Sequence, residues 1–258
     1  MTMTELRASY PDLKGKTVLV TGGGTGIGAT TVAAFVEQGS QVAFLDIQEN
    51  ASEQLADSLA AKGQKPLFLP CDVTDIPALR EAIRTVEAQL GAVKILVNNA
   101  ANDQRHEPEA VTPEYWEEQL RINLHHHFFA AQAVQPKMAE SGGGSIINMG
   151  SCSWHMGLGF MPAYTTAKAA IEGVTVSLAR AYGKDRIRVD CVIPGSVRTP
   201  RQVKEIITPE YEEFIVGQQC LPDQIEPEDI SQLVLFLGSD ASRMCTRRNF
   251  CMDAGIGA

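Results

Sequence analysis

Short, almost continuously apolar runs alternate with amphipathic segments along the whole chain. Runs that are apolar throughout, rather than at every second position, are typical of parallel strands covered on both faces. The apolar runs predict strands at residues 16–22, 41–46, 66–73, 94–100, 145–151, 187–195 and 249–255. The amphipathic segments predict helices over residues 27–39, 50–63, 75–91, 112 into the 130s, and 162–182.

Residues that start and stop helices flank several of these segments. Asp75 precedes its helix as an N-cap, and Gly39 and Gly63 follow the ends of two other helices. Asn50 or Ser52 is expected to open the helix that Gly63 closes. Repeated strand–helix units predict right-handed crossovers and an α/β fold, a Rossmann-type doubly wound parallel sheet of about seven strands with helices on both faces.

No linker or low-complexity tract divides the chain, so we expect a single domain over residues 1–258. Residues 1–13 are expected to form a polar tail. The irregular segment 198–226 follows the sixth predicted strand. Ligands of open α/β sheets bind beyond the carboxyl ends of the strands, and this segment is therefore predicted to be a substrate lid.

Composition and charge narrow the possible partners. The formal net charge of −9 argues against a protein that binds nucleic acid. No apolar stretch is long enough to span a bilayer, and the start of the chain lacks a signal core, so no membrane partner is expected. The cysteines form no CxxC pair and most lie in apolar runs, which predicts reduced core thiols in a cytoplasmic protein: Cys71, Cys152, Cys191, Cys220, Cys245 and Cys251.

A glycine-rich turn follows the first predicted strand, with glycines at 22, 23, 24, 26 and 28. Glycine lets the backbone approach a pyrophosphate, whose charge the N-terminus of the next helix stabilises. This strand–turn–helix context predicts a dinucleotide site.

Asp46 ends the second predicted strand, where a carboxylate accepts hydrogen bonds from the ribose hydroxyls of adenosine. A helix cap is the structural alternative for this residue. The carboxylate repels a 2′-phosphate, and no Lys or Arg lies in residues 22–28 or 47–50. We therefore expect NAD rather than NADP.

The spacing Gly22-x-x-x-Gly26-x-Gly28 resembles that of the short-chain dehydrogenase/reductase family, and the resemblance extends from Lys14 to Gly255. Similar segments follow in the family's order: CDVTD at 71–75, NNAA at 98–101, Asn123, Ser151, Tyr164-x-x-x-Lys168 and PGSVRT at 194–199. The resemblance implies an oxidoreductase of this fold that assembles as a homotetramer.

The resemblance also implies the site residues. The implied catalytic residues are Asn123, Ser151, Tyr164 and Lys168. The implied cofactor contacts are Gly22, Gly24, Thr25, Gly26, Ile27, Gly28, Asp46, Ile47, Asp72, Val73, Asn99, Ala100, Tyr164, Lys168, Pro194, Gly195, Val197 and Thr199. No metal site is implied.

The residue chemistry agrees with these roles. Tyr164 and Lys168 are at i and i+4 and share one helix face. The lysine ammonium and a positive nicotinamide are expected to lower the pKa of the tyrosine, which then acts as general base. Ser151 is expected to hydrogen-bond the same substrate oxygen, and Asn123 to order water in a relay to Lys168. Taken alone, a Tyr-x-x-x-Lys pair could also be a solvated pair on a helix surface.

Three positions depart from the family's pattern. Ala101 stands where the family has a glycine after Asn-Asn-Ala, Arg247 stands in a usual Thr-Gly turn, and Ala254 replaces a glycine of Asp-Gly-Gly. The departures concern local backbone detail and subunit contacts rather than the chemistry.

Within the family, NDQRH at 102–106, INMGSCSWHMGL at 147–158 and QQCL at 218–221 resemble bacterial sugar 1-dehydrogenases that act on aldoses such as D-xylose. Polar residues at this edge suit a substrate with several hydroxyls, whereas a steroid or acyl chain needs apolar lining. The expected substrate contacts are Asn102, His106, Ser151, Ser153, Trp154, His155, Tyr164 and Gln202. A core position is the alternative for Trp154, and a structural hydrogen bond is the alternative for His155.

The expected reaction is oxidation of an aldose at C1 to the lactone, with a pentose such as D-xylose or L-arabinose, or L-fucose or D-galactose, as substrate. A reductase or dehydrogenase of another alcohol or ketone (a polyol, a 3-oxoacyl thioester or a hydroxysteroid) is the enzymatic alternative. A non-catalytic NAD-binding regulator is the alternative from another class.

The tract His125-His126-His127 does not fit a metal site, because successive residues of a helix point about 100° apart. We expect this tract to lie at a helix face used between subunits.

Overall fold

The computed structural model describes residues 8–61 and 64–257. The strands of this part of the chain form one parallel seven-stranded sheet in the order β3-β2-β1-β4-β5-β6-β7. They are β1 (Thr17–Thr21), β2 (Gln41–Asp46), β3 (Leu67–Pro70), β4 (Ile95–Asn98), β5 (Gly144–Met149), β6 (Ile187–Pro194) and β7 (Asn249–Met252). Six of these strands lie within the predicted apolar runs and β5 begins one residue before its run, at Gly144, so the predicted fold class is confirmed.

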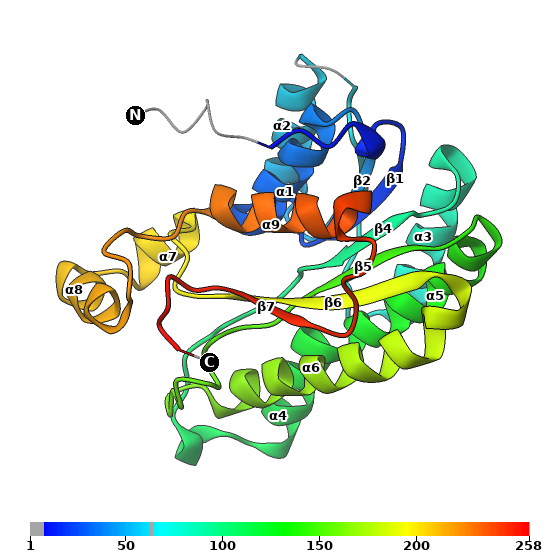
Figure 1. Cartoon of the computed structure of the whole chain (residues 1–258). Helices are drawn as coiled ribbons and strands as arrows, with labels where there is room; N and C mark the ends of the chain where they lie inside the picture. The colour runs from blue at the N-terminus through cyan, green and yellow to red at the C-terminus, as the bar shows by residue number, and fades with distance from the viewer. Residues whose placement is uncertain (1–7, 62–63, 258) are drawn as a thin grey trace.

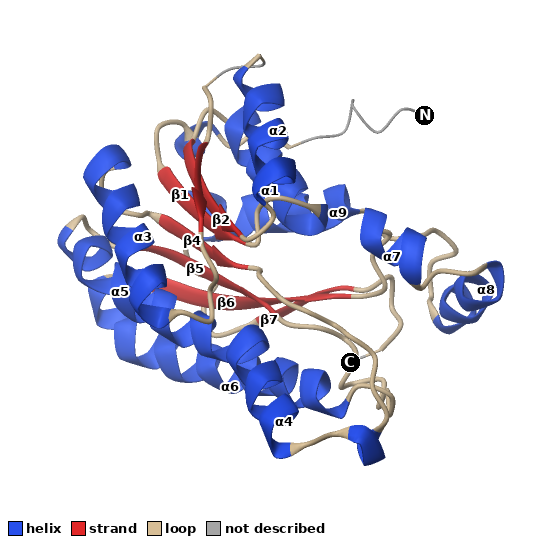
Figure 2. Ribbon diagram, turned by 180° about the vertical axis from the view of Figure 1, so that it is seen from behind, coloured by secondary structure: helices blue, strands red, loops and turns tan. Residues whose placement is uncertain are grey.

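Helices cover both faces of the sheet (Figure 1). They are α1 (Gly26–Glu37), α2 (Glu49–Ala60), α3 (Ile76–Leu90), α4 (Pro113–Leu120), α5 (His126–Glu140), α6 (Pro162–Tyr182), α7 (Pro200–Glu205), α8 (Pro209–Gln218) and α9 (Pro227–Gly238). Figure 2 shows α1, α2 and α9 on one side of the sheet and α3, α5 and α6 on the other. The short helices α7 and α8 extend away from both layers.

The two larger hydrophobic clusters of the described residues lie on opposite faces of the sheet, because successive strand residues point to opposite sides. Val18 and Val20 of β1 pack with Phe35 of α1 on one face. Leu19, between them, packs with Ile83 of α3 on the other face. Burial on both faces explains why the strand sequences are apolar throughout rather than alternating.

The predicted helix boundaries hold in part. Asp75 caps α3 by accepting from Ala78 N at 3.0 Å. Helix α2 starts at Glu49 with Gln48 as N-cap, so the expectation of a cap at Asn50 or Ser52 is wrong. Both positions lie within the first turns of that helix, and the Ser52 side chain is buried. The expected stop at Gly63 lies outside the described residues.

The helix expected from Thr112 into the 130s is interrupted. Thr112 caps α4, but a π-helical turn over Arg121–His125 separates α4 from α5. Such a turn shifts the hydrogen-bond ladder of a helix and is frequent at functional sites.

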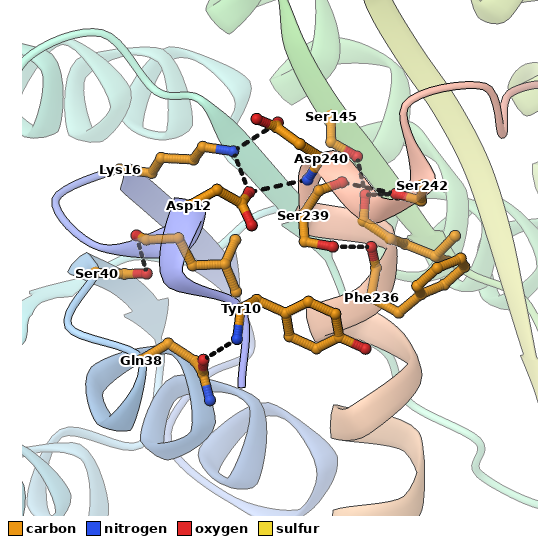
Figure 3. Close-up of polar contacts among 12 residues, drawn as sticks. Tyr10, Asp12, Lys16, Gln38, Ser40, Ser145, Phe236, Ser239, Asp240 and Ser242 are labelled. Carbon is orange, nitrogen blue, oxygen red and sulfur yellow. Dashed lines mark hydrogen bonds and ion pairs between the residues drawn. The ribbon is translucent and has the colours of Figure 1, made fainter. Parts of the chain in front are cut away.

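The segment expected to be a polar tail is part of the fold from Tyr10 onward. Tyr10 N donates to Gln38 Oε1 at 2.8 Å, and Leu13 is fully buried. Asp12 accepts from Lys16 Nζ and from Asp240 N, each at 2.8 Å, which joins this segment to the turn after α9 (Figure 3). Residues 10–13 are therefore part of the fold, and the prediction of a polar tail over residues 1–13 is wrong for them. Residues 1–7 lie outside the described part.

The cysteines divide into two groups. Cys71, Cys152 and Cys191 are buried thiols, as expected. The expectation of a core position is wrong for the others, since Cys220 and Cys251 are exposed and Cys245 is half-buried. Cys251 lies in β7, the edge strand of the sheet, where alternate side chains are not covered.

Among the described helices, none has the length and hydropathy that a membrane crossing requires.

Two of the departures from the family's pattern occupy left-handed backbone conformations. Arg247 has φ of 63° and Ala254 has φ of 54°. A residue with a Cβ is strained in this region by about 1–2 kcal/mol, whereas glycine is not. A glycine at either position would adopt this backbone conformation without strain, which explains why the family's pattern has glycine there.

Replacing Arg247 by glycine is expected to stabilise the protein by about 1 kcal/mol, because the strain of the left-handed backbone is removed. The melting temperature should rise by about 2–4 °C for a chain of this size. Thermal unfolding followed by circular dichroism measures this change.

Arg243→Gly is the matched control, because Arg243 is also exposed but has φ of −52°. This control should lower the melting temperature. Equal destabilisation by both substitutions would contradict the account.

Candidate active site

One cleft opens along the carboxyl edge of the sheet, with a volume of about 850 Å³. The segments that follow β1, β2 and β3 line one half, and those that follow β4, β5 and β6 line the other. The strand order reverses between β1 and β4. Open α/β sheets bind their ligands outside the carboxyl ends of the strands at this reversal.

The glycine-rich turn after β1 leaves no room for side chains at two cleft-lining positions. Gly22 has φ of 64°, and a Cβ there would lie 2.7 Å from Ala100 Cα. A Cβ on Gly28 would lie 1.8 Å from the carbonyl oxygen of Gly22. The turn therefore presents bare backbone to a ligand, as the close approach of a pyrophosphate requires.

The N-terminus of α1 faces the cleft without a side-chain cap. Thr25 is the N-cap residue, and its hydroxyl accepts no bond from the first-turn N–H groups. Thr25 and Gly26 line the cleft. Asn99 fixes the turn by donating Nδ2 to Gly22 O at 2.8 Å and to Thr21 O at 3.1 Å. A fixed turn and an uncapped helix end fit the phosphates of a dinucleotide.

Asp46 connects the turn to the next βα unit. Its side chain is 7% exposed, and its Oδ2 accepts from Gly24 N at 2.8 Å. Its Oδ1 accepts from Gln48 N, also at 2.8 Å. Asp46 is thus not the N-cap of α2, and its carboxylate lines the cleft beside Ile47 and Gln48.

Nearly all of the residues predicted to contact a cofactor line this cleft. Those that do are Gly22, Thr25, Gly26, Ile27, Gly28, Asp46, Ile47, Asp72, Val73, Asn99, Ala100, Tyr164, Lys168, Pro194, Gly195, Val197 and Thr199. Gly24 does not line it, because its N–H is bound to Asp46. A Cβ on Gly24 would lie 2.4 Å from Ser52 Oγ, so this glycine supports the turn from behind.

The predicted catalytic side chains of α6 and of the segment after β5 meet in the other half of the cleft. Lys168 is 1% exposed, and its Nζ donates to Met149 O at 2.7 Å. The same Nζ lies 5.5 Å from the centre of the Tyr164 ring. Ser151 is hydrogen-bonded to Tyr164, and its Oγ accepts from Ser153 N at 3.1 Å. A hydroxyl pair beside a buried ammonium suits proton transfer with a substrate alcohol.

Opposing influences act on the pKa of Tyr164. Burial and the Asp103 carboxylate raise this pKa, while the hydrogen bond with Ser151 and the charge of Arg105 lower it. Lys168, which was expected to lower it, donates to a backbone carbonyl, and burial lowers its own pKa to about 8. The expected effect of the lysine is therefore not found in the protein alone, where Tyr164 is held as a neutral phenol.

Asn123 lies in the π-helical turn and does not line the cleft. It is fully buried, and its Oδ1 accepts from Asn102 N at 2.8 Å. Its Nδ2 donates to Asn102 O at 3.1 Å. The side chain thus pins the segment after β4, and its predicted part in a water relay stays a prediction.

Some of the predicted substrate contacts line the cleft beside Ser151 and Tyr164: Asn102, Ser153 and Gln202. Ser153 is 4% exposed, and its Oγ has no hydrogen-bond partner within the described part of the chain. Gln202 Nε2 donates to Asp103 Oδ2 at 2.6 Å, which joins α7 to the segment after β4.

The other predicted substrate contacts do not line the cleft, namely His106, Trp154 and His155. His106 Nε2 accepts from Ala163 N at 3.3 Å, at the start of α6. Trp154 Nε1 donates to Glu172 Oε1 at 2.8 Å, and its ring stacks on His155 with centres 3.7 Å apart. Because Glu172 holds both rings against the outside of α6, the predicted sugar contacts of Trp154 and His155 are corrected.

The substrate half of the cleft has apolar lining that the sequence analysis missed: Met156, Leu158, Met161, Tyr211 and Ile215. The apolar residues between Ser153 and Tyr164 in the sequence were the available signal. The lining is therefore mixed, and not predominantly polar as expected.

The tract at 125–127 is not a surface feature. His126 and His127 are fully buried behind the ends of β4 and β5. His126 Nε2 donates to Ala100 O at 2.9 Å, and burial lowers the pKa of His126 to about 3. The expected subunit contact is therefore wrong for these two residues. No three His, Cys, Asp or Glu side chains of residues 8–61 and 64–257 are grouped so as to hold a metal ion.

Comparisons with known proteins agree with this geometry. Residues 22–257 match a family model described as enoyl-(acyl carrier protein) reductase. The chain is 50% identical over 248 residues to D-xylose 1-dehydrogenase of Caulobacter vibrioides, covering 96% of this chain and 98% of that protein. It is 44% identical over 255 residues to "Probable galactose dehydrogenase" of Rhizobium meliloti, covering 98% and 100%.

Among solved structures, the chain is similar to a blue fluorescent protein from a metagenomic library in complex with NADPH. The TM-score is 0.89 and the identity is 33%, with 96% of this chain and 100% of that chain covered. Sequence and fold therefore agree over nearly the full length. The chain belongs to the short-chain dehydrogenase/reductase family of oxidoreductases.

Proposed function

We propose that this protein oxidises an aldose at C1 to the lactone with NAD as hydride acceptor and Tyr164 as general base. The observation that carries the proposal is the convergence of Ser151, Tyr164 and Lys168 in one cleft with the bare glycine turn. The 50% identity to a D-xylose 1-dehydrogenase supports a pentose as the first substrate to test.

Each proton or hydride that moves in this reaction is assigned to a residue or to the cofactor. Tyr164 takes the proton of the anomeric hydroxyl, and the C1–O bond becomes a carbonyl as C1 loses its hydrogen as hydride. When bound, NAD supplies the hydride acceptor at its nicotinamide. Ser151 donates to the same oxygen, which stays on C1 and becomes the carbonyl oxygen of the lactone. Tyr164 must be a phenolate to take this proton; the positive charge of the nicotinamide, when NAD is bound, would favour that form together with the buried ammonium of Lys168.

The preference for NAD over NADP is supported by the charge at the end of β2. Asp46 lines the cleft there with Thr25, Ile47 and Gln48, none of which is basic. A 2′-phosphate at this position would meet a carboxylate and no cation. The NADPH in the related solved structure makes a parallel test with both cofactors necessary.

We further propose that α7 and α8, within residues 198–226, form the substrate lid. Arg201 Nη1 lies 3.1 Å from Asp103 Oδ1, and Gln202 Nε2 donates to Asp103 Oδ2 at 2.6 Å. Asp103 is therefore the point at which the lid is fastened across the cleft to the segment after β4.

Replacing Asp103 by alanine is expected to raise KM for the aldose by about tenfold, because the lid loses two charge-assisted contacts worth about 1–2 kcal/mol together. The acidic limb of the pH–rate profile should move to lower pH, since the Asp103 carboxylate raises the pKa of Tyr164. Steady-state kinetics across pH measure both effects.

Asp103→Asn separates the two effects, because its amide oxygen still accepts from Gln202. KM should then change less, with the same shift of the acidic limb. Wild-type KM and pH profile in the alanine variant would contradict the lid assignment.

A ketone reductase or hydroxysteroid dehydrogenase is the second candidate function. The apolar part of the lining favours it, namely Met156, Leu158, Met161, Tyr211 and Ile215. A panel of aldoses, polyols, hydroxysteroids and hydroxyacyl thioesters, each with NAD and with NADP, tests the two candidates. Reduction of the nicotinamide by an aldose and NAD is expected, and a response to a steroid alone would favour the second candidate.

A single domain, a homotetramer and a cytoplasmic location stay predictions. The similarity to sugar dehydrogenases over 96% of the chain supports a small-molecule substrate. Light scattering of the purified protein tests the tetramer.

A further inference from the structure

Arg105, on the segment after β4, is assigned neither the proton nor the hydride in the proposed reaction. It is half-buried and lines the substrate half of the cleft. Its Nη1 lies 3.3 Å from Met161 Sδ, and its guanidinium lies 5.0 Å from the centre of the Phe160 ring. Within the described part of the chain, no carboxylate lies within 4.0 Å of this guanidinium, so its donors other than the one that meets Met161 Sδ are left for a ligand.

The backbone around Arg105 is fixed on both sides. Upstream, Asn102 is bound twice by the Asn123 side chain. Downstream, His106 N donates to Phe160 O at 2.9 Å, and His106 Nε2 accepts from Ala163 N at 3.3 Å. A side chain held by such neighbours is positioned for recognition rather than free to search. His106, expected to contact the substrate, thus serves as an anchor for this segment.

The other cations of this half of the cleft differ from Arg105. Arg201 is paired with Asp103 at 3.1 Å, and Lys168 is bound to a backbone carbonyl at 2.7 Å. Arg121 and Lys204 are exposed, so water satisfies their donors. Arg105 alone among these five combines partial burial with donors that meet no oxygen of the described residues.

We propose that Arg105 is a specificity-determining residue that donates hydrogen bonds to hydroxyl oxygens of the aldose while Tyr164 holds its anomeric hydroxyl. This inference rests on the proposed function. A guanidinium stacked on an aromatic ring presents its donors in one plane, which suits neighbouring oxygens of a sugar ring. Closing the cleft over a substrate removes water from these donors, and the sugar oxygens replace it.

A second consequence follows from the charge of Arg105. The groups that shift the pKa of Tyr164 are Asp103 and Arg105 from the segment after β4, and Ser151 and Cys152 from the segment after β5. Lys168 of α6 also faces Tyr164, with its Nζ 5.5 Å from the ring centre. The positive charge of Arg105 favours the phenolate form of Tyr164. Without that charge, Tyr164 loses its proton only at higher pH, so the acidic limb of the rate profile moves upward.

The test uses the full chain with Arg105→Gln and Arg105→Lys, and Arg180→Gln as a matched control on the exposed last turn of α6. Arg105→Gln should raise KM for the aldose by about 10- to 100-fold, the effect of losing charge-assisted hydrogen bonds. Its KM for NAD should stay within about twofold, and its acidic limb should move to higher pH. Arg105→Lys should restore the position of the acidic limb but not the KM for the aldose. Lysine keeps the positive charge but lacks the planar set of donors of a guanidinium.

Deoxy aldoses identify the contact. An aldose that lacks the hydroxyl bound by Arg105 should react equally well with the wild type and with Arg105→Gln, whereas other deoxy aldoses should keep the difference. Unchanged KM and pH profile in Arg105→Gln, with an active wild type, would overturn this inference and leave the proposed function intact. A wild type that oxidises no aldose would overturn both.

Discussion

Replacing Tyr164 by phenylalanine is expected to lower kcat by about 10²- to 10⁴-fold, the usual contribution of a positioned general base. The hydroxyl that takes the substrate proton is lost, while the ring that packs against Lys168 stays. Binding of NAD should persist, because the glycine turn lies in the other half of the cleft. Initial rates of nicotinamide reduction and a fluorescence titration with NAD measure the two effects.

Tyr182→Phe is the matched control, because Tyr182 ends the same helix and packs against the core of the α3 face. Its kcat should equal that of the wild type. Full turnover in the Tyr164→Phe variant would contradict the assignment of Tyr164 as general base. It would indicate that another group takes the substrate proton.

The second large effect concerns the turn after β1. Gly28→Ala places a methyl group 1.8 Å from the Gly22 carbonyl oxygen and 2.8 Å from Asn99 Nδ2. Because the first partner is a backbone atom and the second is the side-chain donor that fixes the turn, the turn must open, at a cost of about 1–3 kcal/mol in the free energy of unfolding. The affinity for NAD should fall by at least about tenfold, since the phosphates lose their donors.

Gly173→Ala is the matched control for this substitution. Gly173 lies inside α6, and no atom other than those of its chain neighbours and its own helical backbone lies within 4 Å of the position of its added Cβ. Alanine there should stabilise the helix by about 1 kcal/mol and leave NAD affinity unchanged. Calorimetric titration with NAD and thermal unfolding of both variants test the prediction. Equal NAD affinities in the two variants would refute it.

The sheet could be predicted because its signal is local. Strands buried on both faces need apolar residues throughout, and Val18, Leu19 and Val20 of β1 fill both cores. The glycine turn and the pair Tyr164 and Lys168 could be predicted for the same reason, since one turn or one helix positions each set.

Side-chain directions in the loops could not be predicted, because partners distant in the sequence decide them. Trp154 and His155 turn away from the cleft because Glu172 of α6 accepts from one ring and contacts the other. His126 is buried, and its Nε2 donates to the carbonyl oxygen of Ala100, two residues after the end of β4. No short-range pattern shows either contact.

The composition of the lining was missed for a related reason. Met156 and Met161 follow the polar residues Ser151, Ser153 and His155 in the sequence, and the fold turns both methionines toward the cleft. The sugar assignment therefore depends on the polar groups that remain in the lining, among them Asn102, Ser153 and Gln202.

The central claim is hydride transfer from C1 of an aldose to NAD. An aldose deuterated at C1 tests it most directly, with the product and the reduced nicotinamide both identified by mass spectrometry. Deuterium is expected in the nicotinamide, and the lactone is expected in an amount equal to that of the reduced cofactor. Deuterium retained in the sugar, with oxidation at another carbon or none at all, would contradict it.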